Sequence, residues 1–185
     1  GETARTSIIN DDLWTFDGDS KNCTGVPEPY FIFQINTSLI SGTEFSFQAD
    51  DADLTVQWGD GNSEDFSGTG LISHDYSSDG IYNVSLNGSA SRIVFGYYWS
   101  GPQDALIDIL TNMSSGLTGI NSSENMFRDA DNFVNASAVG WFDDVSGDVT
   151  DMRFMFYHAN SANPNVSNWN TSSVTDMIWM FSYSQ

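Results

Sequence analysis

The chain has 185 residues, of which 39% are hydrophobic and 14% aromatic, enough to bury a core in one or two domains. Its formal net charge at pH 7 is −20, because 25 Asp and Glu residues, 20 of them Asp, stand against five Lys and Arg. A field of this sign repels nucleic acid and anionic membrane surfaces, so both are excluded as partners. The chain shows no apolar run of membrane-spanning length and no signal peptide, so we expect no membrane insertion and a mature or trimmed chain.

The abundance of Asp leaves the question of a metal open. Carboxylates in loops are hard oxygen ligands of the kind that calcium takes. Asp is also an ordinary turn residue, and an acidic surface is typical of proteins from salty surroundings. The sequence therefore indicates no required cofactor, and bound calcium and a merely solvated acidic surface are the two alternatives.

Asparagine is concentrated in glycosylation sequons. Nine of the 16 asparagines begin an Asn-x-Ser/Thr triplet, where the 39 Ser and Thr residues would give roughly three by chance. The nine are Asn22, Asn36, Asn83, Asn87, Asn112, Asn121, Asn135, Asn165 and Asn170. An N-linked glycan needs a surface position and an export route, so the excess predicts a glycoprotein that is extracellular or on the cell surface. The alternative is that turns rich in Asn and Ser create sequons that carry no glycan.

Residues 1–30 are interpreted as a separate N-terminal segment. Ile8, Ile9, Leu13 and Trp14 make it too apolar for a solvated tail. The segment either supplies the first strands of the following domain or is donated as a strand to a neighbouring subunit. Cys23, the only cysteine, cannot form an intrachain bridge, so it is either a buried thiol or a link between two molecules.

Residues 31–98 predict a β domain. Short apolar runs in this region are separated by clusters of Gly, Asp and Ser. Within one run, alternation puts Val56 and Trp58 on one face and Gln57 on the other. These patterns predict a small β-sandwich with one face exposed to water.

Three motifs in this region resemble the polycystic-kidney-disease-type (PKD) immunoglobulin-like domain. They are Trp58-Gly59-Asp60-Gly61, His74-Asp75-Tyr76-Ser77 and Gly80-Ile81-Tyr82-Asn83-Val84. The sequence departs from the family pattern because it lacks the two residues between the Trp and the Gly-Asp-Gly turn. The resemblance implies an immunoglobulin-like sandwich. We expect Asp60 to form the turn by binding neighbouring amides, and His74 to be a structural residue whose ring is satisfied by the backbone.

Residues 99–185 contain a repeat with a period of 25 residues. The sequence Val-Thr-Asp-Met-Arg-Phe-Met-Phe at 149–156 recurs as Val-Thr-Asp-Met-Ile-Trp-Met-Phe at 174–181, and a less regular copy lies at 120–127. Such a repeat predicts a solenoid, in which each unit buries its apolar face against its neighbours.

Spacing within the unit predicts its local structure. Val174, Met177 and Met180 fall on one helical stripe, so each unit is expected to open with about two helical turns. A short strand with Val166 facing inward is expected at 166–170. Trp169 is expected to stack on Trp141, its counterpart in the preceding unit, along the solenoid axis.

Residues 120–185 resemble the BspA-like leucine-rich-repeat surface proteins. The resemblance is carried by the Asn-Val-Ser-Asn-Trp-Asn-Thr-Ser segment at 165–172 and the Val-Thr-Asp-Met phrase that follows it. It implies an exported protein of the cell surface and offers no catalytic residue to carry over. The expected fold is therefore mainly β with short helices: a PKD-like β-sandwich at 31–98, followed by a BspA-like leucine-rich-repeat solenoid at 99–185.

The solenoid is expected to have an open C-terminal end, because no polar cap follows the last unit and apolar surface is left uncovered. Either further repeats beyond this sequence or another subunit docking end to end would complete it. The predicted assembly interface between copies of the chain consists of Ile8, Ile9, Leu13, Trp14, Met177, Trp179, Met180 and Phe181. A contact between two different surfaces of one molecule propagates unless it closes into a ring. The sequence thus predicts a non-enzymatic extracellular structural protein, a subunit of a glycosylated cell-surface filament or layer that assembles head to tail.

The sequence leaves two alternative functions open. A cell-surface adhesin or carbohydrate-binding module would stack sugars on exposed aromatic residues such as Tyr97, Tyr98 and Trp99, although these also fit a junction between two domains. An enzyme, for example a glycosidase using Asp143 and Asp144, has only adjacent carboxylates to support it.

Overall fold

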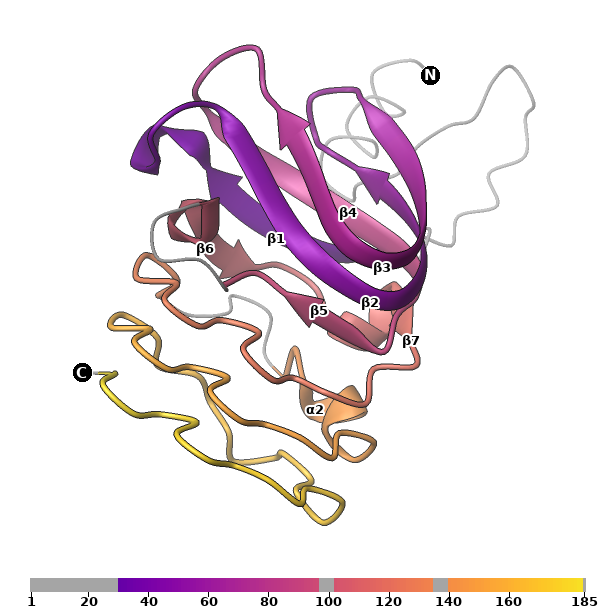
Figure 1. Ribbon diagram of the computed structural model, residues 1–185, viewed down its shortest axis with the longest axis vertical. Coiled ribbons are helices and arrows are strands. Elements are labelled where there is room, and N and C mark those ends of the chain that lie inside the picture. Colours follow the sequence, from indigo (N-terminus) through magenta and orange to yellow (C-terminus); the bar gives the residue numbers. More distant parts are fainter. Residues whose placement is uncertain (1–29, 97–101, 135–139, 185) are drawn as a thin grey trace, which may run out of the picture.

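The computed structural model describes residues 30–96, 102–134 and 140–184, which form a β-sheet and a stack of loops below it (Figure 1). The strands are β1 (Phe31–Asn36), β2 (Glu44–Gln57), β3 (Ser63–Asp75), β4 (Ile81–Ser89), β5 (Arg92–Val94), β6 (Leu106–Ile109) and β7 (Leu117–Thr118). The short helices are η1 (Thr37–Leu39), η2 (Pro102–Ala105), η3 (Met113–Ser115) and α2 (Asp143–Ser146). The described chain is therefore mainly β with few helices, as the sequence predicts.

Alternation of side chains builds the core face of the sheet. Along β2, Val56 is fully buried and Gln57 is exposed, and Trp58 directly after the strand is buried again, which confirms the predicted pattern. The strands are ordered β3-β2-β4-β1-β6, with β5 paired to β2 and β7 paired to β4. The β4–β7 pairing is parallel and the other named pairings are antiparallel.

Strands β2 and β3 form one long hairpin that bends at its middle. The register shifts between Ala49 and Ala52, and Asp51 between them has a φ of +46°. On one side of the bend β2 pairs with β5, and on the other side it pairs with β4. The strands of the predicted sandwich are therefore joined in one continuous hydrogen-bonded sheet, because the bent hairpin connects both halves.

The sheet continues past residue 98, where the sequence analysis placed the start of the repeat domain. Strand β6 pairs with β1, and β7 pairs with β4. The buried side chains of Leu106, Ile109 and Leu117 draw these short segments against the sheet core. The segment before the repeats is thus built into the sheet.

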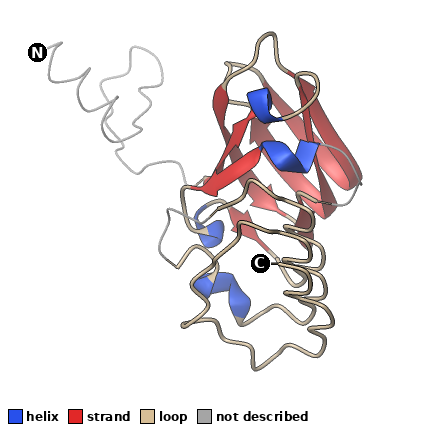
Figure 2. Cartoon of the chain, turned by 90° about the vertical axis from the view of Figure 1, so that its left-hand side faces the viewer, coloured by secondary structure: helices blue, strands red, loops and turns tan. Residues whose placement is uncertain are grey.

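Below the sheet lie three parallel loops, which we call the first rung (residues 121–130), the second rung (150–159) and the third rung (175–184). Figure 2 shows them stacked one beneath the other. In the first and second rungs, the N–H groups of four alternate residues donate to carbonyls of the rung that follows; one such bond joins Phe127 to Met155 (2.9 Å). Ser122 aligns with Asp151, and Asp151 aligns with Asp176. The rungs therefore form a parallel ladder in register.

Each rung consists of turns, so the prediction of two helical turns per unit is wrong. In the second rung, Met155 donates to the Met152 carbonyl and Ala159 donates to the Phe156 carbonyl, which closes two successive four-residue turns. The buried residues Met152, Met155 and Phe156 still follow helical spacing. A helix would have used the backbone N–H groups internally, whereas here every second one is needed by the neighbouring rung.

The segment that leads into the third rung also differs from expectation. Val166 to Trp169 form a turn closed by a 3.2 Å hydrogen bond, and Val166 is 43% exposed instead of facing inward. The rings of Trp141 and Trp169 do meet, with centroids 6.0 Å apart, but their planes are at 86°. The contact is edge-to-face, an arrangement that aromatic pairs favour over a full face-to-face stack.

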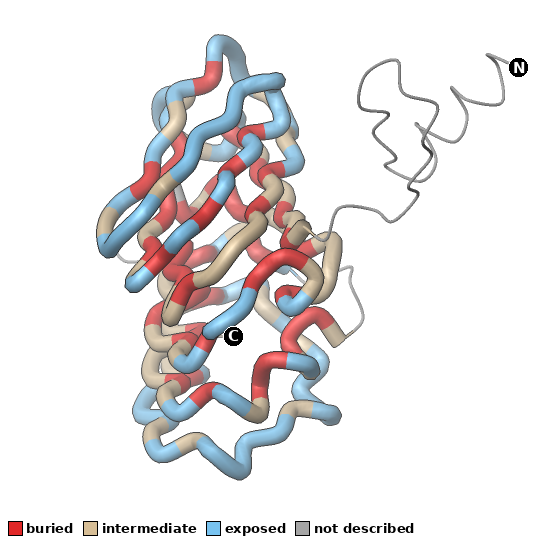
Figure 3. Tube along the Cα trace, turned by 90° about the vertical axis from the view of Figure 1, so that its right-hand side faces the viewer, coloured by how far each residue is buried: buried red, intermediate tan, exposed pale blue. Residues whose placement is uncertain are grey.

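One hydrophobic core runs through the sheet and the rungs, from Phe31 to Met180. Figure 3 shows buried positions continuing from the sheet into the loops beneath it. Phe95, directly after β5, donates its N–H to the Met126 carbonyl of the first rung (2.8 Å). The sheet thus covers the upper end of the rung stack. None of the described helices is long or apolar enough to cross a membrane.

Candidate functional site at the open edge of the third rung

The third rung carries a row of backbone donors at the lower end of the stack. The N–H groups that correspond to the inter-rung donors of the second rung are those of Met177, Trp179, Phe181 and Tyr183. Within the described part of the chain, none of these four N–H groups donates a hydrogen bond. An unpaired row of alternate N–H groups is a template for another β segment.

Large apolar side chains surround these donors. Their exposed fractions are 44% for Met177, 56% for Ile178, 57% for Trp179, 48% for Phe181 and 67% for Tyr183. This exposed row of backbone and side chains is called the open edge below. Contiguous apolar surface of this kind is typical of an interaction site.

Of the third-rung residues predicted for the assembly interface, Met177, Trp179 and Phe181 lie on the open edge and Met180 does not. Met180 is only 8% exposed and belongs to the core, because it follows the inward positions of Met126 and Met155 in the other rungs. Ile178 was not predicted as part of the interface, because the sequence alone does not show which alternate residues face the end of the ladder.

A column of phenylalanine rings runs along the stack and ends at the open edge. It consists of Phe95, Phe127, Phe156 and Phe181, with centroids of neighbouring rings 5.7, 5.3 and 5.4 Å apart. The last two rings are parallel within 2°. Among the described residues, no ring follows Phe181 in this column, so one face of its ring is uncovered.

Two shorter columns end beside it. Tyr157 stacks on Trp179 at 6.0 Å, and His158 stacks on Tyr183 at 4.9 Å. Arg128 of the first rung lies over the Tyr157 ring, with its guanidinium carbon 4.9 Å from the centroid. The open edge therefore presents three neighbouring aromatic rings at the end of three columns.

Two residues of every rung hold left-handed backbone, with φ between +56° and +63°. They are Asn125, Asp129, Phe154, His158, Trp179 and Tyr183. Asn and Asp adopt this conformation readily, whereas bulky side chains in it cost about 1–2 kcal/mol per residue. Aromatic residues therefore replace better-suited polar ones in the second and third rungs, at a cost in backbone free energy.

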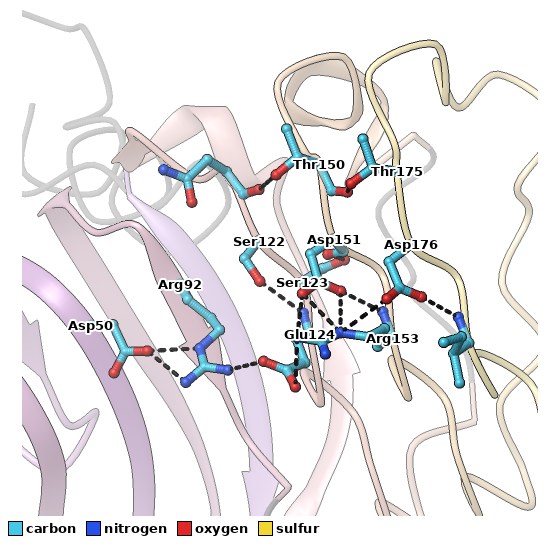
Figure 4. A network of polar contacts seen from close by, with 12 residues as sticks. Asp50, Arg92, Ser122, Ser123, Glu124, Thr150, Asp151, Arg153, Thr175 and Asp176 are labelled. Carbon is cyan, nitrogen blue, oxygen red and sulfur yellow. Dashed lines mark hydrogen bonds and ion pairs between the residues drawn. The ribbon is translucent and has the colours of Figure 1, made fainter.

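A ladder of charges runs along the other side of the rungs, from the sheet to Asp176 in the third rung (Figure 4). Arg92 pairs with Asp50 and with Glu124, both at 2.7 Å. Arg153 in turn lies 3.3 Å from Glu124 and 2.7 Å from Asp151, and its hydrogen bond with Asp151 raises its pKa. These pairs join β2 and β5 of the sheet to the first and second rungs.

In the third rung the ladder ends at Asp176, which lies 3.6 Å from Arg153, and the next position along the ladder is apolar. Ile178 occupies the position that Glu124 and Arg153 hold in the first two rungs. Ile178 itself adds no charge to the open edge, and the neighbouring Asp176 carboxylate is paired with Arg153, which suits a contact that excludes water.

Several predicted site residues lie outside the described residues. They are Ile8, Ile9, Leu13, Trp14, Asn22, Cys23, Tyr97, Tyr98, Trp99 and Asn135. Among the described sequons, four asparagines are exposed: Asn83, Asn121, Asn165 and Asn170. Asn36, Asn87 and Asn112 are half-buried. The exposed four meet the requirement of surface access for a glycan.

The Gly-Asp-Gly turn after β2 is a structural cluster. Gly59 and Gly61 have φ values of +83° and +96°, and Asp60 accepts the Asn62 N–H (3.0 Å), as predicted. The expected backbone partner of His74 is wrong: its Nε2 meets Asp60 Oδ2 at 2.8 Å. Burial raises the pKa of Asp60, but hydrogen bonds from His74 and Asn62 outweigh it and lower that pKa to about 2.

Aromatic packing fixes the His74 ring in this cluster. The ring stacks on Trp58 with centroids 5.0 Å apart and planes within 12°. Next to it, the Tyr76 hydroxyl donates to the Trp58 carbonyl (2.9 Å), and burial raises the pKa of that hydroxyl above its usual range. The structural role expected for these residues fits this packing, but the carboxylate partner of His74 lies 14 residues away and is not apparent from a strand pattern.

The adjacent carboxylates Asp143 and Asp144 lie on α2 and bind different neighbours. Ser114 donates to Asp144 (2.8 Å), and Asn168 donates to Asp143 (3.3 Å). A shallow concavity of about 260 Å³ is instead lined by the turn after β2 together with Asn83 and Ser85. Within the described ranges, no three His, Cys, Asp or Glu side chains gather as metal ligands would.

Comparison with known proteins gives a match for the part of the chain that contains the rungs. The chain has no match among the curated proteins or among the solved structures. Residues 113–185, from η3 through all three rungs to the open edge, are similar to the family described as "Mycoplasma protein of unknown function, DUF285".

Proposed function

We propose that this protein is a non-enzymatic extracellular structural protein, a subunit of a glycosylated cell-surface filament or layer whose copies assemble head to tail. The observation that carries the proposal is the open edge of the third rung. Its four N–H groups gain acceptors, and its apolar side chains leave water, when a β segment from another copy adds to the ladder. The opposite end of the stack is covered by the sheet, so the contact joins two different surfaces and propagates.

The location and the finer fold belong to the same proposal. The exposed sequons Asn83, Asn121, Asn165 and Asn170 support an exported glycoprotein. The resemblance of the Gly-Asp-Gly turn region to PKD domains, and of the repeats to BspA-like leucine-rich-repeat proteins, supports a cell-surface role. Glycopeptide mass spectrometry of protein from the native cell tests whether the sequons carry glycans. Unmodified peptides at all nine sequons would show that the protein is not glycosylated.

Assembly is tested by placing a charge on the open edge. Ile178→Glu puts a carboxylate where a paired segment would bury it, so we expect the polymer fraction in a sedimentation assay to fall at least tenfold. Leu71→Glu on β3 is the matched control, because Leu71 is 57% exposed and Ile178 is 56% exposed. The control should assemble like the unchanged protein.

Two results would contradict the proposal. If negative-stain electron microscopy of the unchanged protein shows only discrete particles and no polymers, the protein does not form a filament. Equal polymer fractions for Ile178→Glu and Leu71→Glu would show that the open edge is not the contact.

The alternative function is a cell-surface adhesin or carbohydrate-binding module. The exposed rings of Trp179 and Tyr183 favour it, because aromatic faces of this kind can stack on sugars. A monomer that binds a glycan array, and loses that binding in Trp179→Ala, would support the adhesin over the filament.

A further inference from the structure

We propose that residues 9–18 of one copy form a fourth rung on the open edge of the next copy. This inference deepens the head-to-tail assembly proposed above and rests on it. It names the segment that fills the open edge, and it follows from a sequence match that the register of the three described rungs makes visible.

The three rungs share a set of positions that the segment repeats. Each rung is preceded by an apolar residue two places before its aligned position, which is Ser122, Asp151 or Asp176. These apolar residues are Ile120, Val149 and Val174, and the segment has Ile9 at the same place. At the aligned position itself the segment has Asp11. In the third rung, the Asp176 side chain accepts the Ile178 N–H (2.9 Å), so an Asp here closes the start of a rung.

The match continues through the aromatic columns. Trp14 aligns with Trp179, and Phe16 aligns with Phe181, the last ring of the phenylalanine column. Phe16 would therefore cover the free face of Phe181. This pairing extends the column by one ring at the usual spacing of stacked rungs.

The segment also suits the backbone of a rung. Gly18 aligns with Tyr183, one of the two positions that hold left-handed backbone in every rung, and glycine adopts that conformation without a steric cost. Following the rule of the ladder, the four free N–H groups of the open edge would donate to the carbonyls of residues 11, 13, 15 and 17. Carbonyl acceptors are available at all four, because every residue type provides one.

The departures from the pattern fit a terminal position. Where the second rung has buried Met152 and Met155, the segment has Asp12 and Thr15. Polar residues at these positions would be costly inside the stack, but at its end the position of Asp12 reaches water, as Met177, its counterpart in the third rung, is 44% exposed. The segment is therefore suited to end a stack and unsuited to lie within one.

Chain direction favours a neighbouring copy as the source of the segment. Tyr30 lies against Gly116, on the side of the molecule where the rungs begin. A parallel fourth rung ends with Gly18 on the opposite side, so in the same copy residues 19–29 would have to return across the rung and past the whole stack. These eleven residues reach about 40 Å at full extension, and a linker whose relaxed length is shorter than the span it must cross gains little effective concentration.

The test is a cross-link between two single variants in a Cys23→Ser background. Leu13→Cys and Ile178→Cys are at matching rung positions, which places their Cα atoms about 5 Å apart, within the range of a disulfide. When the two variants are mixed and oxidised, we expect the cross-linked pair to form at least tenfold more than from Leu13→Cys mixed with Leu71→Cys. Leu71 is the control because it is exposed to the same extent as Ile178.

Each outcome is decisive for the segment. A mixed cross-link no stronger than the control overturns the inference. A double variant that carries both Leu13→Cys and Ile178→Cys gives a second outcome: a disulfide that forms only within single molecules of it also overturns the inference, because the segment would then cap its own copy. Electron microscopy of the unchanged protein judges the filament separately: fibres without the cross-link leave head-to-tail assembly standing through another contact and remove residues 9–18 from it.

Discussion

Phe154 and Trp179 hold left-handed backbone, although neither is a glycine or a short polar residue. In the first rung the same position is Asn125, which takes this conformation easily. In the third rung the aromatic residue at this position, Trp179, stacks on Tyr157, at a backbone cost of about 1–2 kcal/mol. Sequence patterns did not reveal this position, because an aromatic residue is ordinarily evidence against positive φ.

A second residue-scale feature, the Asp60–His74 pair, predicts a pH dependence. The pKa of Asp60 is lowered from 3.8 to about 2 in the folded chain, so its stabilising effect is present above about pH 4 and disappears as pH falls towards 2. After allowance for its contact with solvent, we expect Asp60→Asn to lower the free energy of unfolding by about 1 kcal/mol at pH 5. The difference from the unchanged protein should shrink as pH falls through about 2, where the Asp60 carboxylate becomes protonated, as measured by urea unfolding.

The control for this prediction is Asp79→Asn, since Asp79 is exposed and has no hydrogen bond or ion pair among the described residues. It should have no effect on the free energy of unfolding at either pH. A loss in Asp60→Asn that is the same at pH 5 and pH 2 would show that the carboxylate charge is not what stabilises the turn.

At the scale of elements, the rungs explain which part of the fold the sequence could predict. The period, the aligned residues and the inward positions of Met152, Met155 and Phe156 are all visible in the sequence. That inward spacing is common to a helix and to a chain of four-residue turns. The two differ in where the N–H groups go, and this depends on neighbouring rungs that a single unit does not show.

Gly116 lies where the chain passes very close to the backbone of β1 and β4, and this close approach predicts the effect of a substitution. A Cβ on Gly116 would lie 2.0 Å from the Phe31 nitrogen and 2.2 Å from the Leu86 carbonyl oxygen, where the segment before β7 crosses β1 and β4. We expect Gly116→Ala to lower the free energy of unfolding by about 3 kcal/mol or more, because backbone atoms cannot move aside as a flexible side chain can. Chemical denaturation measures the change.

Gly70→Ala in β3 is the comparison, since its Cβ would meet only the Phe66 ring, at 3.8 Å. That variant should be within about 0.5 kcal/mol of the unchanged protein. Equal losses for the two variants would mean that glycine at 116 is not required by the close approach.

At the scale of the whole molecule, the sheet and the rungs share one core. The sequence analysis separated them near residue 98 because the β pattern ends there and the repeats begin soon after. The pairing of β6 with β1 and of β7 with β4 joins the two regions, and such pairings between distant short segments leave little trace in a local pattern.

A shared core predicts a single unfolding transition. Phe127 is fully buried, and its ring contacts Phe95 near the sheet and Phe156 in the second rung. We expect Phe127→Ala to cost about 3–5 kcal/mol and to shift the melting of the whole chain, with circular dichroism and tryptophan fluorescence giving the same midpoint. Two separate midpoints would mean that the sheet and the rung stack unfold independently.

The rung stack also has a direction. One of its ends is joined to the sheet through Phe95 and Arg92, and the other is the open edge. A fibre built from such units is polar: its two tips differ chemically, and subunits add to them at unequal rates. A label that binds Ile178 would then mark only one tip, because at every other position in the fibre a neighbouring copy covers this residue.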